Sequence, residues 1–300
     1  MSGQAVSPIA PMHRVRGVSG AWLVALGGLL LMYGPVYWHA SQTIWQTEEH
    51  GHGLLVAGVV VWIFWTLRHR IAQAEYRPVS LVGWPLFVAG LLVYALGRAF
   101  DISIFEFGSQ LLVVSGGLLL MRGWAALKVA WFGAVYLIFM VPLPGTFVDA
   151  VTGPLKQWIS EIVQHVLFAV GYPIANTGVI LTVGQYQLMV ADACSGLNSM
   201  FSLLALGTLY MYVMRRQSVL HNAIMLFAIL PIAFAANMVR VTILVLLTYH
   251  FGDEVGQGFL HGAAGLALML VALGILVALD ATLRAMFGGP RIHSATAAAR

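Results

Sequence analysis

Residues 221–250 read HNAIMLFAILPIAFAANMVRVTILVLLTYH, and Arg240 is the one Asp, Glu, Lys or Arg among them. A helix rises 1.5 Å per residue, so about 20 apolar residues cross a hydrocarbon core of about 30 Å. The stretch therefore predicts a membrane-spanning helix with length to spare for a tilt, or for a kink or break at Pro231. A cation inside such a helix is costly, which makes Arg240 a candidate functional residue.

The rest of the chain has the same apolar character. Hydrophobic residues make up 60% of the 300 residues and charged residues 9%, against about 25% charged in a soluble domain. We predict an all-α, polytopic membrane protein with about eight transmembrane helices, the second of them short and the seventh long. The predicted spans are Val18–Tyr37, Gly53–Leu67, Leu81–Leu96, Ile104–Leu120, Ala125–Val141, Ser195–Met214, His221–His250 and Phe259–Ala281.

The basic residues predict the orientation. With a cytoplasmic N-terminus, every Lys and Arg except Arg98, Lys156 and Arg240 falls in a cytoplasmic segment, as the positive-inside rule requires. We expect a cytoplasmic segment at 1–17, one transmembrane domain at 18–285 and a cytoplasmic tail at 286–300. The first apolar stretch is long enough to span and lacks a convincing small-residue cleavage site, so we expect it to remain as an anchor. The net charge of +4 then reflects orientation, and no nucleic-acid partner is expected.

A longer outside stretch joins the fifth and sixth predicted spans. Pro142-Leu-Pro144-Gly145 ends the helix before it, and residues 146–170 have apolar residues at helical spacing. This pattern predicts an amphipathic helix on the outer surface, which either lies in the membrane interface, covers a site, or packs as an ordinary surface helix. The following stretch, Gly171–Gln187, is rich in turn residues and contains a β-like patch.

Cys194 is the only cysteine, so the chain forms no internal disulfide and no cysteine-based metal site. It stands in Ala191-Asp192-Ala193-Cys194-Ser195-Gly196-Leu197, at the predicted outer end of the sixth span. His261 opens the eighth span at the same face, and Arg240 lies in the outer half of the seventh. Taken singly, each has a structural explanation: a packed thiol, a packed histidine, and an arginine that snorkels or pairs with Asp192. Their convergence favours a site.

Thiol-based acyl transfer is the chemistry that these three side chains suit. The pKa of a thiol falls beside a cation or at a helix N-terminus, which favours the nucleophilic thiolate of Cys194. His261 would donate a proton to the leaving amine and activate the next nucleophile. Arg240 would hold the oxyanion of the tetrahedral intermediate. Asp192 would orient Arg240 or His261, or cap the helix.

Three sequence blocks resemble the exosortases, a family of multi-spanning bacterial membrane proteins, and look most like the exosortase B branch. The blocks are Asp192-Ala-Cys194-Ser195-Gly196-Leu197, Asn237-Met-Val-Arg240-Val and Gly258-Phe-Leu-His261-Gly, with His50-Gly51-His52-Gly53 and Pro142-Leu-Pro144 upstream. The resemblance implies that Cys194, Arg240 and His261 are catalytic, with Asp192, Ser195 and Asn237 as possible supporting residues. No cofactor and no metal is implied.

The resemblance also implies a cellular role. Exosortases are regarded as cysteine proteases or transpeptidases that process proteins with a C-terminal sorting signal: a Pro-Glu-Pro motif, a transmembrane helix and a basic cluster. Processing is linked to export and to exopolysaccharide and biofilm production. The expected location is the inner membrane of a bacterium, with the active site at the periplasmic face. The expected partners are the lipid bilayer and such substrate proteins.

Two other interpretations remain at this point. A serine-type intramembrane protease would use Ser195 with His261, although the Gly-x-Ser-x-Gly setting is missing. A non-enzymatic transporter or haem-binding protein would use the histidines near the predicted outer ends, with Glu48 and Glu49 nearby; these are His50, His52, His250 and His261. Haem ligands are expected within facing spans instead, and a transporter is expected to show inverted repeats or paired broken helices.

Overall fold

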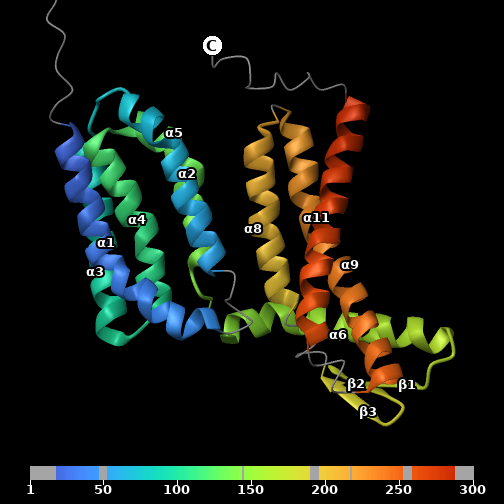
Figure 1. Cartoon of the computed structure of the whole chain (residues 1–300). Helices are drawn as coiled ribbons and strands as arrows, with labels where there is room; N and C mark the ends of the chain where they lie inside the picture. Colours follow the sequence, from blue (N-terminus) through green and yellow to red (C-terminus); the bar gives the residue numbers. More distant parts are fainter. Residues whose placement is uncertain are drawn as a thin grey trace, which may run out of the picture. The chain divides into compact units, whose positions relative to one another are not determined.

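The computed structural model describes residues 18–46, 53–143, 145–189, 196–216, 218–252 and 259–287, and these are mostly helical (Figure 1). The helices are α1 (Val18–Gln42), α2 (Gly53–Gln73), α3 (Ser80–Phe100), α4 (Ser103–Met121), α5 (Trp124–Tyr136), α6 (Gly145–Ala169), α8 (Gly196–Met214), α9 (Val219–Phe251) and α11 (Phe259–Phe287), with 3₁₀ turns η2 (Ile44–Gln46) and η3 (Leu137–Met140). The strands are β1 (Ile174–Thr177), β2 (Ile180–Val183) and β3 (Tyr186–Met189).

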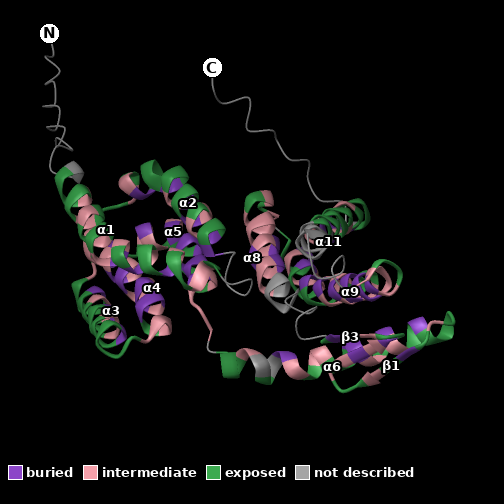
Figure 2. Cartoon of the chain, turned by 60° about the horizontal axis from the view of Figure 1, so that its bottom comes forward, coloured by how far each residue is buried: buried purple, intermediate pink, exposed green. Residues whose placement is uncertain are grey.

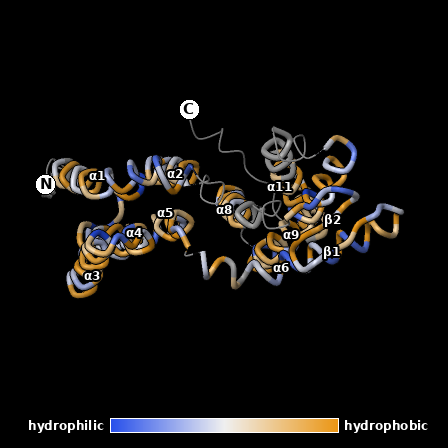
Figure 3. Tube along the Cα trace, turned by 90° about the horizontal axis from the view of Figure 1, so that it is seen from below, coloured by the Kyte–Doolittle hydropathy of each residue, from blue (hydrophilic) through white to orange (hydrophobic). Residues whose placement is uncertain are grey.

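Six of the described helices are long and apolar enough to cross a membrane, and two shorter apolar helices, Trp124–Met140 and Phe201–Met214, accompany them. Large apolar side chains are exposed along them, such as Leu31 at 82%. Figure 2 shows many exposed residues along the long helices, and Figure 3 shows that hydrophobic residues predominate along their traces. A helix that is apolar all round needs a lipid or protein environment. The prediction of a helical membrane protein is confirmed, while the count of eight spans stays a prediction.

The second span is longer than predicted. It was expected to end at Leu67, but α2 continues to Gln73 and is 21 residues long. The helix accommodates its basic end because the Arg68 guanidinium lies over the Trp65 ring, 4.1 Å from the centroid. A long cationic side chain can in this way lie along apolar surface and reach the polar interface with its charged end. Charge therefore did not end this helix.

The chain forms two compact units, of which the first comprises Met1–Ile44 and Val61–Ala134. In it, α3 and α4 pack closely because buried glycines of α3 recur every seven residues, at Gly83, Gly90 and Gly97. From the other side, a Cβ on Gly116 of α4 would lie 2.7 Å from the backbone nitrogen of Phe87. Small residues let transmembrane backbones approach in this way.

Polar side chains also join the helices of the first unit. Tyr33 and Ser109 share a hydrogen bond of 2.8 Å between α1 and α4, and the Tyr94 hydroxyl donates to the carbonyl of Met32 at 2.6 Å. Glu106, which is 4% exposed, pairs with Arg98 at 3.1 Å. Buried polar groups need such partners, particularly where no water is at hand.

The second unit comprises Trp45–Val60 and Val135–Arg300. Its three strands form an antiparallel sheet in the order β1-β2-β3, in the stretch where a β-like patch was predicted. The sheet, α6 and the second half of α9 enclose an apolar cluster, here called the sheet cluster. Its buried members are Ile159, Val163, Leu167, Ile174, Leu181, Val183, Leu188, Val241, Leu244 and Val245.

The remaining helices of the second unit, α8, α9 and α11, pack side by side (Figure 1). They enclose a second apolar cluster, here called the bundle cluster, whose buried members are Leu203, Met225, Ile229, Ala233, Ala272, Leu276 and Leu283. Helix α9 runs through Pro231 as one helix of 33 residues, so the break considered there does not occur. Proline removes one backbone donor, which a long packed helix tolerates.

The close packing of α3 and α4 predicts opposite effects for two glycines of α4. Gly116→Ala should destabilise the protein by about 1–3 kcal/mol, because the new methyl group meets the α3 backbone at Phe87. Gly108→Ala is the matched control, since nothing lies within 4 Å of its Cβ position, and it should be neutral or stabilising by up to about 1 kcal/mol. Thermal denaturation in detergent measures both, and equal midpoints would contradict the close approach.

Candidate functional site

Helix α9 buries a stripe of mostly apolar residues that also contains polar ones, at its start and again beyond its middle. The stripe begins at His221, runs through Met225, Ile229 and Ala233, and continues with Asn237, Arg240, Val241, Leu244, Val245 and Thr248. An exposed arginine would reach lipid headgroups or water, but Arg240 is only 6% exposed. Burial of a cation is costly unless the surroundings compensate it, so this position is a candidate site on physical grounds.

Asn237 and Arg240 lie at the boundary between the two apolar clusters of the second unit. Up to Ala233, the buried apolar residues of α9 belong to the bundle cluster, and from Val241 onward they belong to the sheet cluster. Asn237 is 2% exposed and lies one helical turn before Arg240. Both polar side chains are thus held where α9 passes from α8 and α11 to α6 and the sheet.

A hydrogen bond fixes the depth of α11 relative to α9. His221 Nε2 lies 2.7 Å from Asp280 Oδ1, which makes these two residues level with each other. The two helices are antiparallel, and Arg240 follows His221 by 19 residues on α9. On α11, His261 precedes Asp280 by the same 19 residues. At 1.5 Å per residue, the backbones at Arg240 and His261 therefore share one depth to within about one turn, ~5 Å.

A second contact fixes the depth of α8. A Cβ on Gly207 would lie 2.7 Å from Ile229 Cδ1, so α8 and α9 touch at this level. Arg240 follows Ile229 by 11 residues, and Gly196 precedes Gly207 by 11 residues on the antiparallel α8. The first residue of α8 is therefore level with Arg240 as well, by the same count of helical rise.

Several predicted site residues lie outside the described part of the chain. These are Asp192, Cys194 and Ser195, together with Glu48, Glu49, His50 and His52 of the alternative interpretation. His261 lies in α11, but its side chain is not described; Asn237 and Arg240 are described with their side chains. The structure brings the backbone of His261, the start of α8 and Arg240 to one depth, at the end of the bundle where α8 and α11 begin. We call this the site end.

His250 is exposed and lies beside two tyrosines that pack against the sheet cluster. Its Nε2 lies 3.2 Å from the Tyr172 hydroxyl, and its ring packs edge-on against Tyr172 and Tyr249. Within the described residues, no group of three or more His, Cys, Asp and Glu side chains gathers in a way that could hold a metal ion. The contacts of His250 are those of a packed aromatic residue.

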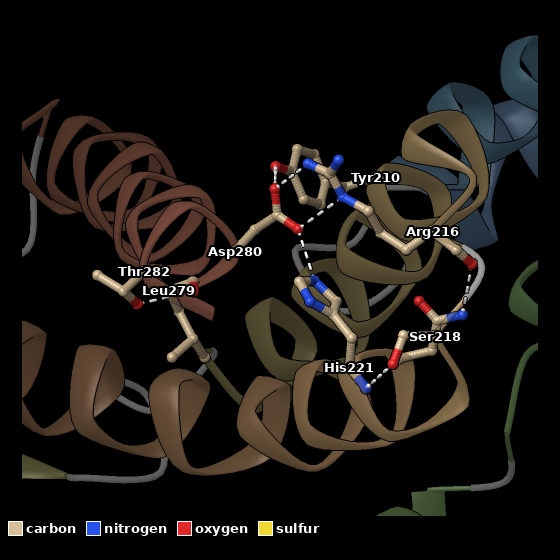
Figure 4. Close-up of polar contacts among 8 residues, drawn as sticks. Tyr210, Arg216, Ser218, His221, Leu279, Asp280 and Thr282 are labelled. Atoms are coloured by element: carbon tan, nitrogen blue, oxygen red, sulfur yellow. Dashed lines mark hydrogen bonds and ion pairs between the residues drawn. The ribbon is translucent and has the colours of Figure 1, made fainter. Parts of the chain in front are cut away.

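A buried ionic network at the other end of the bundle escaped the sequence analysis. Asp280 of α11 accepts hydrogen bonds from the Tyr210 hydroxyl (3.0 Å), Arg216 Nε (3.1 Å), Arg216 Nη2 and His221 Nε2 (Figure 4). The Asp280 side chain is 5% exposed. An acidic residue within the eighth predicted span was the available signal, because the rule that marks Arg240 marks Asp280 equally.

The ionic network and the site end lie a membrane thickness apart. The 19 residues from His221 to Arg240 correspond to about 28 Å of helix, close to the hydrocarbon thickness of about 30 Å. The network includes Arg216, which follows α8 in the connection to α9. Its hydrogen bonds to Asp280 raise the pKa of the Arg216 guanidinium.

These features define a multi-helix membrane protein whose bundle buries polar residues at both ends. The sequence matches the family described as Transmembrane exosortase (Exosortase_EpsH) over residues 44–278, which includes every predicted site residue. The chain therefore belongs to the transmembrane exosortases, and the family implies a membrane peptidase or transpeptidase. Neither the curated proteins nor the solved structures contain a match.

The shared depth predicts which engineered cysteines can be joined to Cys194. A thiol-to-thiol crosslinker with a reach of about one helical turn, ~5 Å, should join Cys194 to His261→Cys. It should fail with Ala272→Cys, which lies 11 residues deeper on the same helix. Intact mass separates one bridge from two single adducts. A reagent that does not cross membranes should work when added outside intact spheroplasts.

The reverse pattern, with a bridge at position 272 and none at 261, would contradict the shared depth. Opened vesicles serve as the control for sidedness, since the reagent then reaches both faces of the membrane. A bridge that forms in opened vesicles but not in spheroplasts would place the site end on the cytoplasmic side.

Proposed function

We propose that this exosortase is a cysteine-type peptidase or transpeptidase with Cys194 as nucleophile, His261 as acid and base, and Arg240 as oxyanion ligand. The observation that carries the assignment is the common depth of Arg240, the backbone of His261 and the first residue of α8. Cys194 precedes that first residue by two positions in the sequence. A cysteine that precedes this level by two residues in the sequence, together with the backbone of a histidine and a buried arginine at it, suits a single reaction centre.

The chemistry proceeds in two halves. The thiolate of Cys194 attacks the scissile carbonyl, and the tetrahedral intermediate collapses to a thioester when the amine leaves with a proton from His261. Water or an acceptor amine then attacks the thioester, His261 takes the proton, and the thiolate is released. A thiolate next to the α8 N-terminus is favoured by the partial positive charge of that helix end.

Arg240 suits the stabilisation of negative charge. It lies where the buried apolar residues of α9 pass from one cluster to the other, and electrostatic interactions are strong in apolar surroundings. Asn237, one turn away and buried, is placed to support the same region. Asp192 would orient Arg240 or His261, or cap α8, and Ser195 would line the same helix start.

The substrate class follows from the family resemblance. We propose substrates with a C-terminal Pro-Glu-Pro motif, a transmembrane helix and a basic cluster, processed during export in connection with exopolysaccharide and biofilm production. The branch that the sequence blocks favour is exosortase B. The positive-inside pattern supports eight spans in a bacterial inner membrane, with both termini cytoplasmic and the site end periplasmic.

We propose that helix α6 lies beside this site end, in the interface at the periplasmic surface of the inner membrane. It buries Ile159, Val163 and Leu167 in the sheet cluster. Its exposed side combines large apolar residues such as Trp158 (57% exposed) and Phe168 (65%) with the polar residues Gln157 and His165. Aromatic side chains with an apolar body and a polar neighbourhood are typical of the membrane interface.

The nucleophile is tested with a co-expressed reporter protein that carries the sorting signal. Cys194→Ala should abolish its processing, and Cys194→Ser should be nearly inactive because a serine hydroxyl is far less acidic than a thiol. Protein level and membrane insertion should stay normal in both variants. Ser195→Ala is the matched control and should remain active. Processing that survives Cys194→Ala and is lost in Ser195→Ala would support the serine-type alternative instead.

Substitutions of Arg240 separate charge from geometry. Arginine offers a planar pair of N–H donors that lysine cannot reproduce, and loss of one such donor typically costs about 10²–10³ in rate. Arg240→Lys should therefore process the reporter slowly, and Arg240→Ala should be close to inactive at normal protein level. If Arg240 only pairs with Asp192, Arg240→Lys should be nearly normal, Arg240→Ala should lower the protein level, and Asp192→Asn should restore it.

A further inference from the structure

We propose that Asp280 and its donors form a positioning device that fixes the register of α8, α9 and α11 and thereby aligns the site end. The partners come from three places: Tyr210 from α8, Arg216 from the connection after α8, and His221 from α9 (Figure 4). One carboxylate of α11 is thus bonded to each of the other two helices of the bundle. The inference rests on the proposed function of the site end.

The network is saturated, which points to a positioning role and not to ligand binding. A carboxylate offers about four acceptor sites, and Asp280 receives four hydrogen bonds from three side chains. The side chains of His221 and Asp280 are 6% and 5% exposed. No acceptor site of Asp280 remains for a metal ion or a substrate group.

The apolar contacts of the bundle specify the alignment less strongly than the network does. Lipid chains are as apolar as leucine, so apolar contacts between transmembrane helices provide little driving force for one register over another. A slide of one helix by a turn, about 5.4 Å, would exchange one leucine contact for another in the bundle cluster. The same slide would separate Asp280 from its donors and leave a buried charge without partners, which is strongly unfavourable. The polar network therefore penalises a slide more heavily than the apolar contacts do, the approach of Gly207 to Ile229 among them.

The alignment reaches the site because helices transmit displacement along their axes. His221 and Asp280 are level, and equal lengths of 19 residues lead from them to Arg240 and His261. An axial shift of α11 at Asp280 therefore appears undiminished at His261. Misplacement of reacting groups by about 1 Å can lower a rate about a hundred-fold. Loss of register should thus lower kcat even though the network lies about 28 Å from the site end.

The decisive variant replaces the whole network by apolar residues: Tyr210→Phe, Arg216→Leu, His221→Leu and Asp280→Leu. Removing all members together leaves no unpaired charge, and such replacements are often neutral or stabilising. The purified variant in proteoliposomes should keep its thermal midpoint, while kcat for the sorting-signal reporter falls about a hundred-fold and KM changes little. Crosslinking from Cys194 should spread from His261→Cys to Gly265→Cys, one turn further along α11.

Two further variants keep the proposal testable. Asp280→Asn preserves the volume of the side chain and should show the same loss of kcat and the same spread of crosslinking to a smaller extent. It provides the test if the apolar variant does not fold. Thr282→Ala lies on the same end of α11, and its hydroxyl bonds only locally, to the carbonyl of Leu279 (Figure 4); it should match the wild type throughout. The proposal is overturned if a folded apolar or Asp280→Asn variant keeps wild-type kcat and wild-type crosslinking.

Failure of this proposal is distinguishable from failure of the proposed function. Crosslinking reports register without any turnover, so it judges the positioning device even if the reporter is never processed. A wild-type protein that does not process the reporter, or a Cys194→Ala variant that does, counts against the proposed function. A crosslinking pattern that spreads in the apolar variant would still support the role of Asp280 in register.

Discussion

Helix α9 has to bury polar side chains at two levels of a stripe that is mostly apolar. The rest of the second unit is arranged around this constraint. At the first level His221 meets Asp280 of α11, and at the second Asn237 and Arg240 lie where the bundle cluster gives way to the sheet cluster. A buried polar group is tolerated only where neighbours satisfy it. The helices that pack against α9 therefore have to lie at fixed axial positions relative to its buried polar side chains. This constraint sets the axial positions of α8 and α11.

The small sheet has a place in the same arrangement. Helix α9 extends beyond the level at which α8 and α11 begin, and its last turns need another apolar surface. Strands β1 to β3 and α6 supply it through Leu181, Val183 and Ile159, each 0% exposed. The chain between α5 and α8 is thus used to cover the protruding part of α9. As a result, the site end is bordered by apolar surface on both sides of Arg240.

The spans could be predicted from the sequence because lipid imposes a simple rule on composition, as residues 221–250 illustrate. Arg240 was recognisable for the same reason, since a charge stands out in an apolar segment. Asp280 obeys that rule as well, but it lies near the end of its span, where it resembles an ordinary interfacial residue. Its partners Tyr210 and His221 are separated from it by 70 and 59 residues. A contact between such distant residues depends on helix packing, which periodicity and composition do not encode.

The length of α2 differs from the prediction for another reason. Arg68 and Arg70 do not end the helix, because their long side chains can reach the membrane interface from within it.

A reason for separating register from chemistry lies in what catalytic side chains have to do. On the proposed mechanism, Cys194 forms and breaks a bond to carbon, and His261 donates and accepts a proton. Arg240 binds the oxyanion of the tetrahedral intermediate, which exists for only part of the catalytic cycle. Bonds among such residues change during turnover, so they cannot hold three helices in register throughout it. The bonds that hold the register have to involve groups that take no part in the reaction, and Asp280 with its four hydrogen bonds meets that condition.

The distance between the network and the site end has an effect of its own, because a network at the opposite end of the bundle is undisturbed by a substrate that docks at the site end. The rigidity of the helices makes the separation workable, since an axial register set at one end of a helix is preserved at the other.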